Sequence, residues 1–204
     1  MDRMAGFRRG GAAAALLVCA LLLTACGGGS ETSADRETGP GRFLKPPTNL
    51  CESVDPAPFV AEYGTPRPGE DHLEATVRDC SFEFEGRMGS APYFLDLFAD
   101  FRPSVEDARS SFARMRDKPS DDRFSALATV KKLGDAAFAF DEEPNDHEVR
   151  SILVVRQSNL VVTVWWDDTV YGSGPDRSEE HRNQIRSKLA NYAASALTRL
   201  ATTP

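Results

Sequence analysis

Residues 136–166 read AAFAFDEEPNDHEVRSILVVRQSNLVVTVWW, and this stretch decides the fold. It is rich in valine, phenylalanine and tryptophan, and such β-branched and aromatic side chains favour strands. Polar residues interrupt the apolar runs twice, at the acidic residues 142–147 and at Ser158-Asn159, as is typical of turns. We therefore expect three consecutive antiparallel strands: Ala136–Asp141, Val149–Arg156 and Leu160–Trp166.

Two further strands and three helices are expected around this stretch. Alternation of apolar and polar side chains predicts one strand from about Thr76 and another from Tyr93 to Phe101. Start and stop signals predict a short helix that ends at Tyr63, a helix that begins at Ser104 and a long helix from about Ser178. Hairpin-connected strands interrupted by helices favour an α+β domain, with an antiparallel β-sheet of about five strands and helices packed on one face.

The N-terminal residues have the pattern of a secretion signal. Arg3, Arg8 and Arg9 form a positive region, and residues 12–23 are an uninterrupted apolar run followed by small residues. A transmembrane helix is the alternative, but it needs about 20 predominantly apolar residues. The run is too short for that, so a cleaved signal peptide is favoured.

The segment Leu23-Thr24-Ala25-Cys26 resembles the lipobox of bacterial lipoproteins. The resemblance implies cleavage before Cys26 and a thioether-linked diacylglycerol on its sulfur. Two acyl chains, such as palmitate, give stable anchoring where one chain would be marginal. An ordinary signal peptide with a coincidental cysteine is the alternative. The expected organisation is a signal peptide over residues 1–25, a flexible tether over 26–48 and one α+β domain over 49–204, anchored to the outer face of the cell membrane.

Cysteine usage agrees with export. Cys19 falls within the signal peptide and Cys26 is the expected lipidation site, which leaves Cys51 and Cys80. Beyond the membrane a lone pair of thiols most often forms a disulfide, and a redox or metal pair is the alternative. The spacing is not C-x-x-C and the histidines are not clustered, so a structural disulfide between Cys51 and Cys80 is favoured.

Three short motifs resemble an actinobacterial lipoprotein family known as domain of unknown function 3558. They are Asn49-Leu50-Cys51 before a short helix, Asp79-Cys80-Ser81-Phe82 on a strand, and the run from Leu133 to Phe138 entering a strand. The resemblance covers most of the expected mature chain and implies an α+β fold with Cys51 paired with Cys80. The family has no established activity, so no function is implied.

Charge and motif content narrow the function further. Lys and Arg number 24 against 31 Asp and Glu, and the net charge of −7 argues against nucleic acid as the main partner. His72, His147 and His181 are isolated on expected surface segments, and no G-x-S-x-G, H-E-x-x-H or P-loop pattern occurs. We therefore expect no catalytic site, no metal site and no cofactor, although a triad can assemble from distant residues.

Two features are candidates for binding. Residues 141–148 carry five carboxylates, but their spacing does not match an EF-hand loop, and a solvated hairpin tip is favoured. Trp165 and Trp166 are consecutive, so on a strand they point to opposite faces. One indole should enter the core. The other should face outward or lie under a helix. An outward indole near Asp167 and Asp168 would stack on a sugar or receive a cationic partner, but packing under the last helix is favoured.

These patterns predict a membrane-anchored extracytoplasmic lipoprotein, acting as a non-enzymatic binding or sensor-like module of the cell envelope. Its partner would be an envelope protein or a small ligand. The alternative is a secreted envelope hydrolase with a triad assembled from distant residues, which would place a serine near a histidine with a carboxylate behind it. A purely structural lipoprotein, the third possibility, would lack a concave pocket and expose an apolar patch.

Overall fold

The computed structural model describes residues 43, 45–69, 74, 76–86, 91–117, 123–125, 127–169 and 178–202. The expected signal peptide, the lipidation site Cys26 and the isolated His72 lie outside these residues. Among the residues described, no helix combines the length and the apolar character that crossing a membrane requires.

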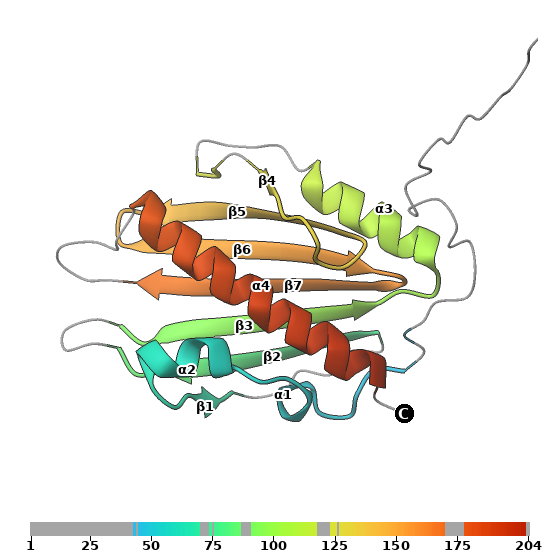
Figure 1. The fold of residues 1–204 in the computed structure, drawn as a ribbon, viewed down its shortest axis with the longest axis horizontal. Coiled ribbons are helices and arrows are strands. Elements are labelled where there is room, and N and C mark those ends of the chain that lie inside the picture. The colour runs from blue at the N-terminus through green and yellow to red at the C-terminus, as the bar shows by residue number, and fades with distance from the viewer. Residues whose placement is uncertain are drawn as a thin grey trace, which may run out of the picture. The chain divides into compact units, whose positions relative to one another are not determined.

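Within the described residues, a seven-stranded antiparallel sheet forms the centre of the fold, in the order β1-β2-β3-β7-β6-β5-β4 (Figure 1). Its strands are β1 (Arg67–Pro68), β2 (Val77–Phe84), β3 (Tyr93–Phe101), β4 (Ala128–Thr129), β5 (Ala136–Asn145), β6 (Glu148–Gln157) and β7 (Leu160–Thr169). The five strands expected from the sequence are β2, β3, β5, β6 and β7. The count of about five is exceeded because two-residue strands, β1 and β4, lie at the edges.

Four helices accompany the sheet in the described part of the chain: α1 (Leu50–Ser53), α2 (Ala57–Tyr63), α3 (Val105–Arg116) and α4 (Glu179–Thr202). Asn49 caps α1 by accepting the backbone N–H of Glu52. Ser104 caps α3 in the same way by accepting the N–H of Asp107. The helices expected to end at Tyr63 and to begin near Ser104 and Ser178 are therefore present, and α1 is additional.

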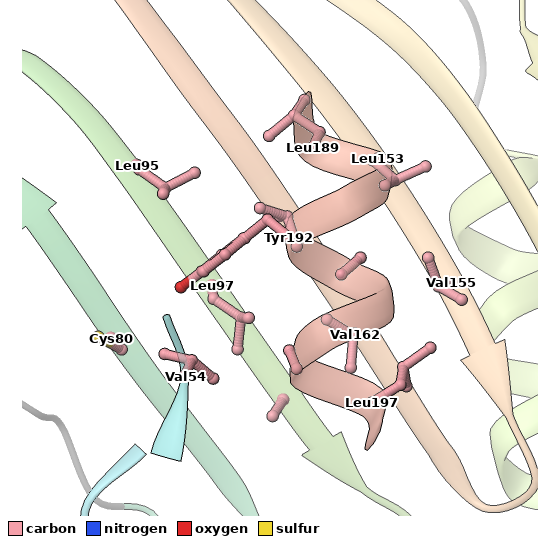
Figure 2. Close-up of a cluster of buried hydrophobic side chains, with 14 of the residues drawn as sticks. Val54, Cys80, Leu95, Leu97, Leu153, Val155, Val162, Leu189, Tyr192 and Leu197 are labelled. Atoms are coloured by element: carbon pink, nitrogen blue, oxygen red, sulfur yellow. The ribbon is translucent and has the colours of Figure 1, made fainter. Parts of the chain in front are cut away.

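The main core lies between the sheet and α4, which crosses the strands diagonally (Figure 1). Figure 2 shows Tyr192 of α4 pointing toward Leu95 and Leu97 of β3, which are both fully buried. Helical spacing predicts the apolar face of α4, and all five of its expected core residues are buried: Ile185, Leu189, Tyr192, Ala196 and Leu200.

The helix α3 packs on the opposite face of the sheet, which corrects the expectation that all helices share one face. Its Ala108 and Phe112 form a second apolar cluster with Phe138 of β5. The central strands are apolar on both faces: Leu153 belongs to the main core, whereas the next residue, Val154, belongs to the α3 cluster. Both faces of these strands are therefore buried, one beneath α4 and the other beneath α3. The α+β class itself is confirmed.

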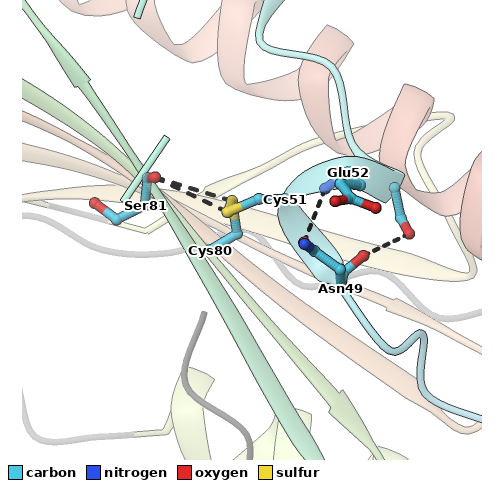
Figure 3. Close-up of a disulfide and its surroundings, with 6 residues drawn as sticks. Asn49, Cys51, Glu52, Cys80 and Ser81 are labelled. Carbon is cyan, nitrogen blue, oxygen red and sulfur yellow. Dashed lines mark hydrogen bonds between the residues drawn. A yellow bond between two sulfur atoms is a disulfide. The ribbon is translucent and has the colours of Figure 1, made fainter. Parts of the chain in front are cut away.

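The expected disulfide joins Cys51 of α1 to Cys80 of β2, with the two Cα atoms 5.1 Å apart (Figure 3). It connects a helix of only four residues to the sheet. The sequence separation of 29 residues corresponds to a stabilisation of roughly 3 to 4 kcal/mol in the chain-entropy model. The bridge therefore holds the beginning of the domain against β2.

The packed part of the chain begins within the segment expected to be a flexible tether. Phe43 is 4% exposed and belongs to the main core. Asn159, in the turn between β6 and β7, accepts the N–H of Phe43 (2.9 Å) and donates to the carbonyls of Phe43 and Arg102 (both 2.8 Å). Phe43 is thus packed against the domain although it precedes the expected start at residue 49, and the residue that binds it lies 116 positions further along the chain.

Candidate functional site

The two consecutive tryptophans of β7 point to opposite faces of the sheet, as expected. Trp166 is 1% exposed and stacks on the rings of Phe59 and Tyr93, with centroid distances of 4.7 and 5.4 Å. The ring of Tyr63 contacts it as well. Trp166 is therefore the indole that enters the core.

Trp165 lies half-buried on the other face, where its ring stacks on Phe98 of β3 with a centroid distance of 5.7 Å. Phe98 is 38% exposed, and Phe94 on the same strand is 36% exposed. Among the described residues, the cluster under α3 includes side chains of β5, β6 and β7 and none of β3. We name the uncovered part the open face and define it by five residues: Phe94, Asp96, Phe98, Trp165 and Asp167.

Asp96 lies at the centre of the open face. It is opposite Trp165 across the β3–β7 pair and opposite Ser81 across the β2–β3 pair. The side chains of both neighbours donate hydrogen bonds to its carboxylate. Burial nevertheless raises the pKa of Asp96, and the negative charge of Asp167 adds to the rise. A half-buried carboxylate that disfavours its own charged form is typical of functional sites.

One arginine beside the open face is surrounded by three carboxylates. The Nε atom of Arg150 donates to Asp167 at 2.5 Å, and its two Nη atoms contact Glu148 at 3.2 Å and Glu142 at 3.4 Å. Burial raises the pKa of Asp167 even though Arg150 opposes the rise. Carboxylates therefore outnumber the cation at this point, and the local charge is negative.

An apolar cavity of about 250 Å³, partly open to solvent, lies between α3 and the sheet, directly beside Trp165. Met115 of α3 forms one wall, and Phe140, Trp165 and neighbouring aliphatic side chains form the other. Thr163 supplies a hydroxyl, which donates to the Met115 sulfur at 3.9 Å, and Arg150 supplies the charged group of the lining. The cavity and the open face share Trp165, so they form one continuous site.

A second cavity of about 280 Å³ lies where α4 approaches the segment before β5. Its lining includes Lys132, Gln157 and Thr198 but neither an aromatic ring nor a carboxylate. These described residues offer no ring on which a ligand could stack and no carboxylate that could hold a cation. The cavity beside Trp165 is the stronger candidate.

The acidic segment 141–148 is not a solvated hairpin tip as a whole, because β5 continues to Asn145. Its first residue, Asp141, is fully buried and accepts hydrogen bonds from Ser151 (2.9 Å) and Arg186 (2.5 Å). This carboxylate ties β5 and β6 to α4. Within the residues that the structure describes, no three His, Cys, Asp or Glu side chains are grouped as a metal site would require.

The side chain of Asp168, like that of Trp166, points toward the face of the sheet that α4 covers. Its Oδ2 atom lies 3.4 Å from Nε2 of His181 in the first turn of α4. The Ser178 hydroxyl accepts the backbone N–H of His181 at 3.2 Å, as a helix cap does. His147 is exposed in the turn between β5 and β6. The candidate residues Asp167 and Asp168 thus belong to two different faces.

Sequence reasoning identified Trp165 and Asp167 but missed Asp96, Phe98 and Arg150. Alternation along residues 93–101 places Asp96 outward, on the face away from the main core. Nothing in the sequence indicated that β3 pairs with β7, and that pairing brings Asp96 to Trp165. The sequence signal that could have found the site is the pair of phenylalanines, Phe94 and Phe98, that flank Asp96 on the outward side of β3. A strand face in contact with water alone would be expected to carry polar side chains there.

Comparisons with known proteins do not supply a function. No family model matches the chain, and no curated protein matches its sequence. The function is therefore argued from the open face and the cavity beside it, together with the N-terminal sequence pattern.

Proposed function

We propose that the protein is a lipoprotein anchored to the outer face of the cell membrane through Cys26, and that its domain binds a ligand or partner on the open face without catalysing a reaction. The observation that carries the binding role is the continuity of the open face with the apolar cavity beside Trp165. Concave apolar sites with a few convergent polar groups are the usual form of binding sites.

The exposed aromatic side chains support a binding role. Among the described residues, three large apolar side chains are clearly exposed, and two of them, Phe94 and Phe98, lie on the open face. Single exposed apolar residues are normal, but contiguous ones mark interaction surfaces. Here Phe98 continues directly into Trp165 and from there into the cavity.

The extracytoplasmic location is supported by two independent features. One is the lipobox-like segment that ends at Cys26. The other is the disulfide between Cys51 and Cys80, since structural disulfides persist in oxidising compartments outside the cytoplasm. A lipid anchor at a membrane and a binding face on the attached domain together describe a receptor-like or accessory module of the envelope.

Mass spectrometry of the protein isolated from membranes tests the anchor. We expect an N-terminal peptide that begins at Cys26 and carries the mass of diacylglycerol, and we expect Cys26→Ser to remain uncleaved. An unmodified Cys26, or a leader retained on the wild-type chain, would refute the anchor.

Photo-crosslinking in intact cells tests the binding face. Benzoylphenylalanine at position 98 should give a crosslinked product that disappears with Trp165→Ala. The same probe at position 127 is the matched control, because Leu127 is also exposed (49%) but precedes β4 at the opposite edge of the sheet. Equal crosslinking at both positions would contradict the assignment of the open face.

A hydrolase is the second candidate function, and the pair of Asp168 and His181 is the observation that favours it. A carboxylate behind a histidine is two thirds of a catalytic triad. Turnover of a cell-wall or ester substrate by the purified chain, lost with His181→Ala, would establish this function. Under the main proposal, neither the wild-type protein nor the His181→Ala variant turns over substrate.

A further inference from the structure

The size and lining of the cavity beside Trp165 limit what can enter it. A volume of about 250 Å³ accommodates a group of about eight non-hydrogen atoms at roughly 30 Å³ each. Its walls are largely carbon, with Thr163 as the one hydroxyl among the lining residues. A sugar ring would lose hydrogen bonds to water here without gaining replacements, and unpaired polar groups are costly to bury. The cavity therefore favours a short alkyl chain or a small ring.

The charge around the opening favours a cation. Two lining residues of the cavity, Arg150 and Trp165, are in contact with carboxylates. Arg150 contacts Asp167, Glu142 and Glu148, and Trp165 hydrogen-bonds Asp96. With these four carboxylates and Arg150 ionised, their net charge is −3. An anionic ligand would be repelled by this arrangement, and a neutral ligand would gain nothing from it.

Asp96 is the carboxylate best placed to meet a ligand's positive charge. Asp167 is already held by two nitrogen atoms of Arg150. The side chains that hydrogen-bond Asp96 are the neutral Ser81 and Trp165, and Arg150 acts on this carboxyl through its charge alone. A cation beside Asp96 would offset the desolvation that raises the pKa of this carboxyl.

Trp165 adds a second attraction for a cation at the same place. One part of its indole lines the cavity, and its N–H side is turned toward Asp96. Tryptophan is the aromatic side chain that attracts cations most strongly. The apolar wall and the negative group are thus joined by one ring.

We infer that the open face binds a small organic amine, whose short apolar part fills the cavity beneath Met115 and whose ammonium group lies at the opening, over the ring face of Trp165 and beside Asp96. This inference rests on the proposed function and adds the chemical class of its ligand. The site selects the combination of an apolar part and a positive charge, so either one alone binds more weakly.

The two indole N–H groups of the chain provide an internal reporter and an internal control. The chain contains two tryptophans, and each gives its own indole signal in a ¹⁵N–¹H spectrum. Trp165 lines the cavity, whereas Trp166 is buried in the main core. A ligand in the cavity should shift the signal of Trp165 and leave that of Trp166 in place.

The test is a titration of the full chain with four matched probes: hexylammonium, 1-hexanol, hexanoate and methylammonium. We expect hexylammonium to bind about tenfold more tightly than 1-hexanol, which corresponds to about 1.4 kcal/mol. Hexanoate and methylammonium should be the weakest probes. Asp96→Asn should abolish the preference for hexylammonium over 1-hexanol while leaving 1-hexanol binding intact. Glu52→Gln removes the same charge from exposed Glu52 on α1 and should change nothing.

The results that would contradict the amine as ligand differ from those that would contradict the binding face. Equal or tighter binding of 1-hexanol, or an unchanged preference in Asp96→Asn, would overturn the amine as ligand while the binding face stands. Equal shifts of both indole signals would show unspecific partitioning and would also overturn the inference. If no probe shifts the indole signal of Trp165 but crosslinking at position 98 remains specific, the inferred ligand class is wrong and the binding face stands. If both experiments fail, the proposed function fails as well.

Discussion

Asp96 of β3 and Trp165 of β7 lie directly opposite each other in the sheet, and the Trp165 side chain donates a hydrogen bond to the Asp96 carboxylate. Burial raises the pKa of this carboxyl despite the hydrogen bond, so its charged form is disfavoured in the folded state. The pair joins the polar and the apolar parts of the open face, and several consequences of its geometry can be measured.

Replacing Asp96 with Asn should stabilise the fold at neutral pH. Because the folded state raises the pKa of Asp96 above the ordinary value of about 3.9, the folded chain binds this proton more tightly than the unfolded chain. Its stability contribution is therefore greatest in acid and is lost as the pH rises from the unfolded pKa through the folded one. The free energy of unfolding from urea titrations should be higher for Asp96→Asn at pH 7, and the gain should shrink below pH 4. A loss of stability at pH 7 would show that the ionised carboxylate stabilises the fold.

The two adjacent tryptophans should differ sharply when each is replaced with alanine. Trp166→Ala removes a fully enclosed ring and should lower the free energy of unfolding by roughly 3 to 5 kcal/mol. Trp165→Ala removes a half-exposed ring stacked on Phe98 and should cost about 1 kcal/mol. Urea unfolding of both variants checks the difference. Equal losses would mean that Trp165 is as much a core residue as Trp166.

Gly134 should not tolerate a side chain. Its φ is +57°, and a Cβ atom would lie 2.5 Å from the carbonyl oxygen of Arg156, which is backbone and cannot move aside. We expect Gly134→Ala to lower the free energy of unfolding by about 3 kcal/mol, combining left-handed strain with overpacking. Lys132→Gly is the control, because Lys132 has nearly the same φ of 62° and is exposed. It should change stability by less than about 1 kcal/mol, since glycine adopts a positive φ without strain. A loss of less than about 1 kcal/mol in Gly134→Ala would contradict the clash with Arg156.

The disulfide should contribute measurably to stability. The double variant Cys51→Ser and Cys80→Ser opens a loop with a sequence separation of 29 and should lose roughly 3 to 4 kcal/mol. Reduction of the wild-type chain should give the same shift of the unfolding midpoint. An unchanged midpoint in both experiments would show that the bridge does not constrain the chain.

The side chain of Asn159 should hold Phe43 in the main core. Asn159→Ala removes three hydrogen bonds and leaves the N–H of Phe43 without its partner, for an expected loss of about 3 kcal/mol. The amide of Phe43 should also exchange with solvent much faster. Asn145→Ala is the matched control, since Asn145 is exposed at the end of β5 and its replacement should cost less than about 1 kcal/mol. Slow exchange at Phe43 in Asn159→Ala would contradict this role.

The local features of the fold were predictable from the sequence because they depend on near neighbours. The opposite orientation of Trp165 and Trp166 follows from strand geometry alone. The buried face of α4, including Leu189 and Tyr192, follows from helical spacing. The Cys51–Cys80 bridge followed from having one plausible pair.

The features that failed depend on contacts between distant parts of the chain. Asp141 belongs to a segment expected to be a solvated hairpin tip, but it is buried and paired with Arg182 and Arg186 of α4. The position of α3 on the second face could not be deduced from its own apolar stripe, which fits either face. Asp96 lies opposite Trp165 because β3 pairs with β7, and this pairing could not be deduced from the sequence.

Hydroxyl-radical labelling of Trp165, compared between intact cells and the purified chain, tests most directly whether the open face is occupied in the envelope. Trp166 is the control in the same peptide, because its burial should keep its labelling low in both samples. The account predicts that Trp165 is readily oxidised in the purified chain and strongly protected in cells, with protection lost in Asp96→Asn. Equal oxidation of Trp165 in cells and in the purified chain would contradict it.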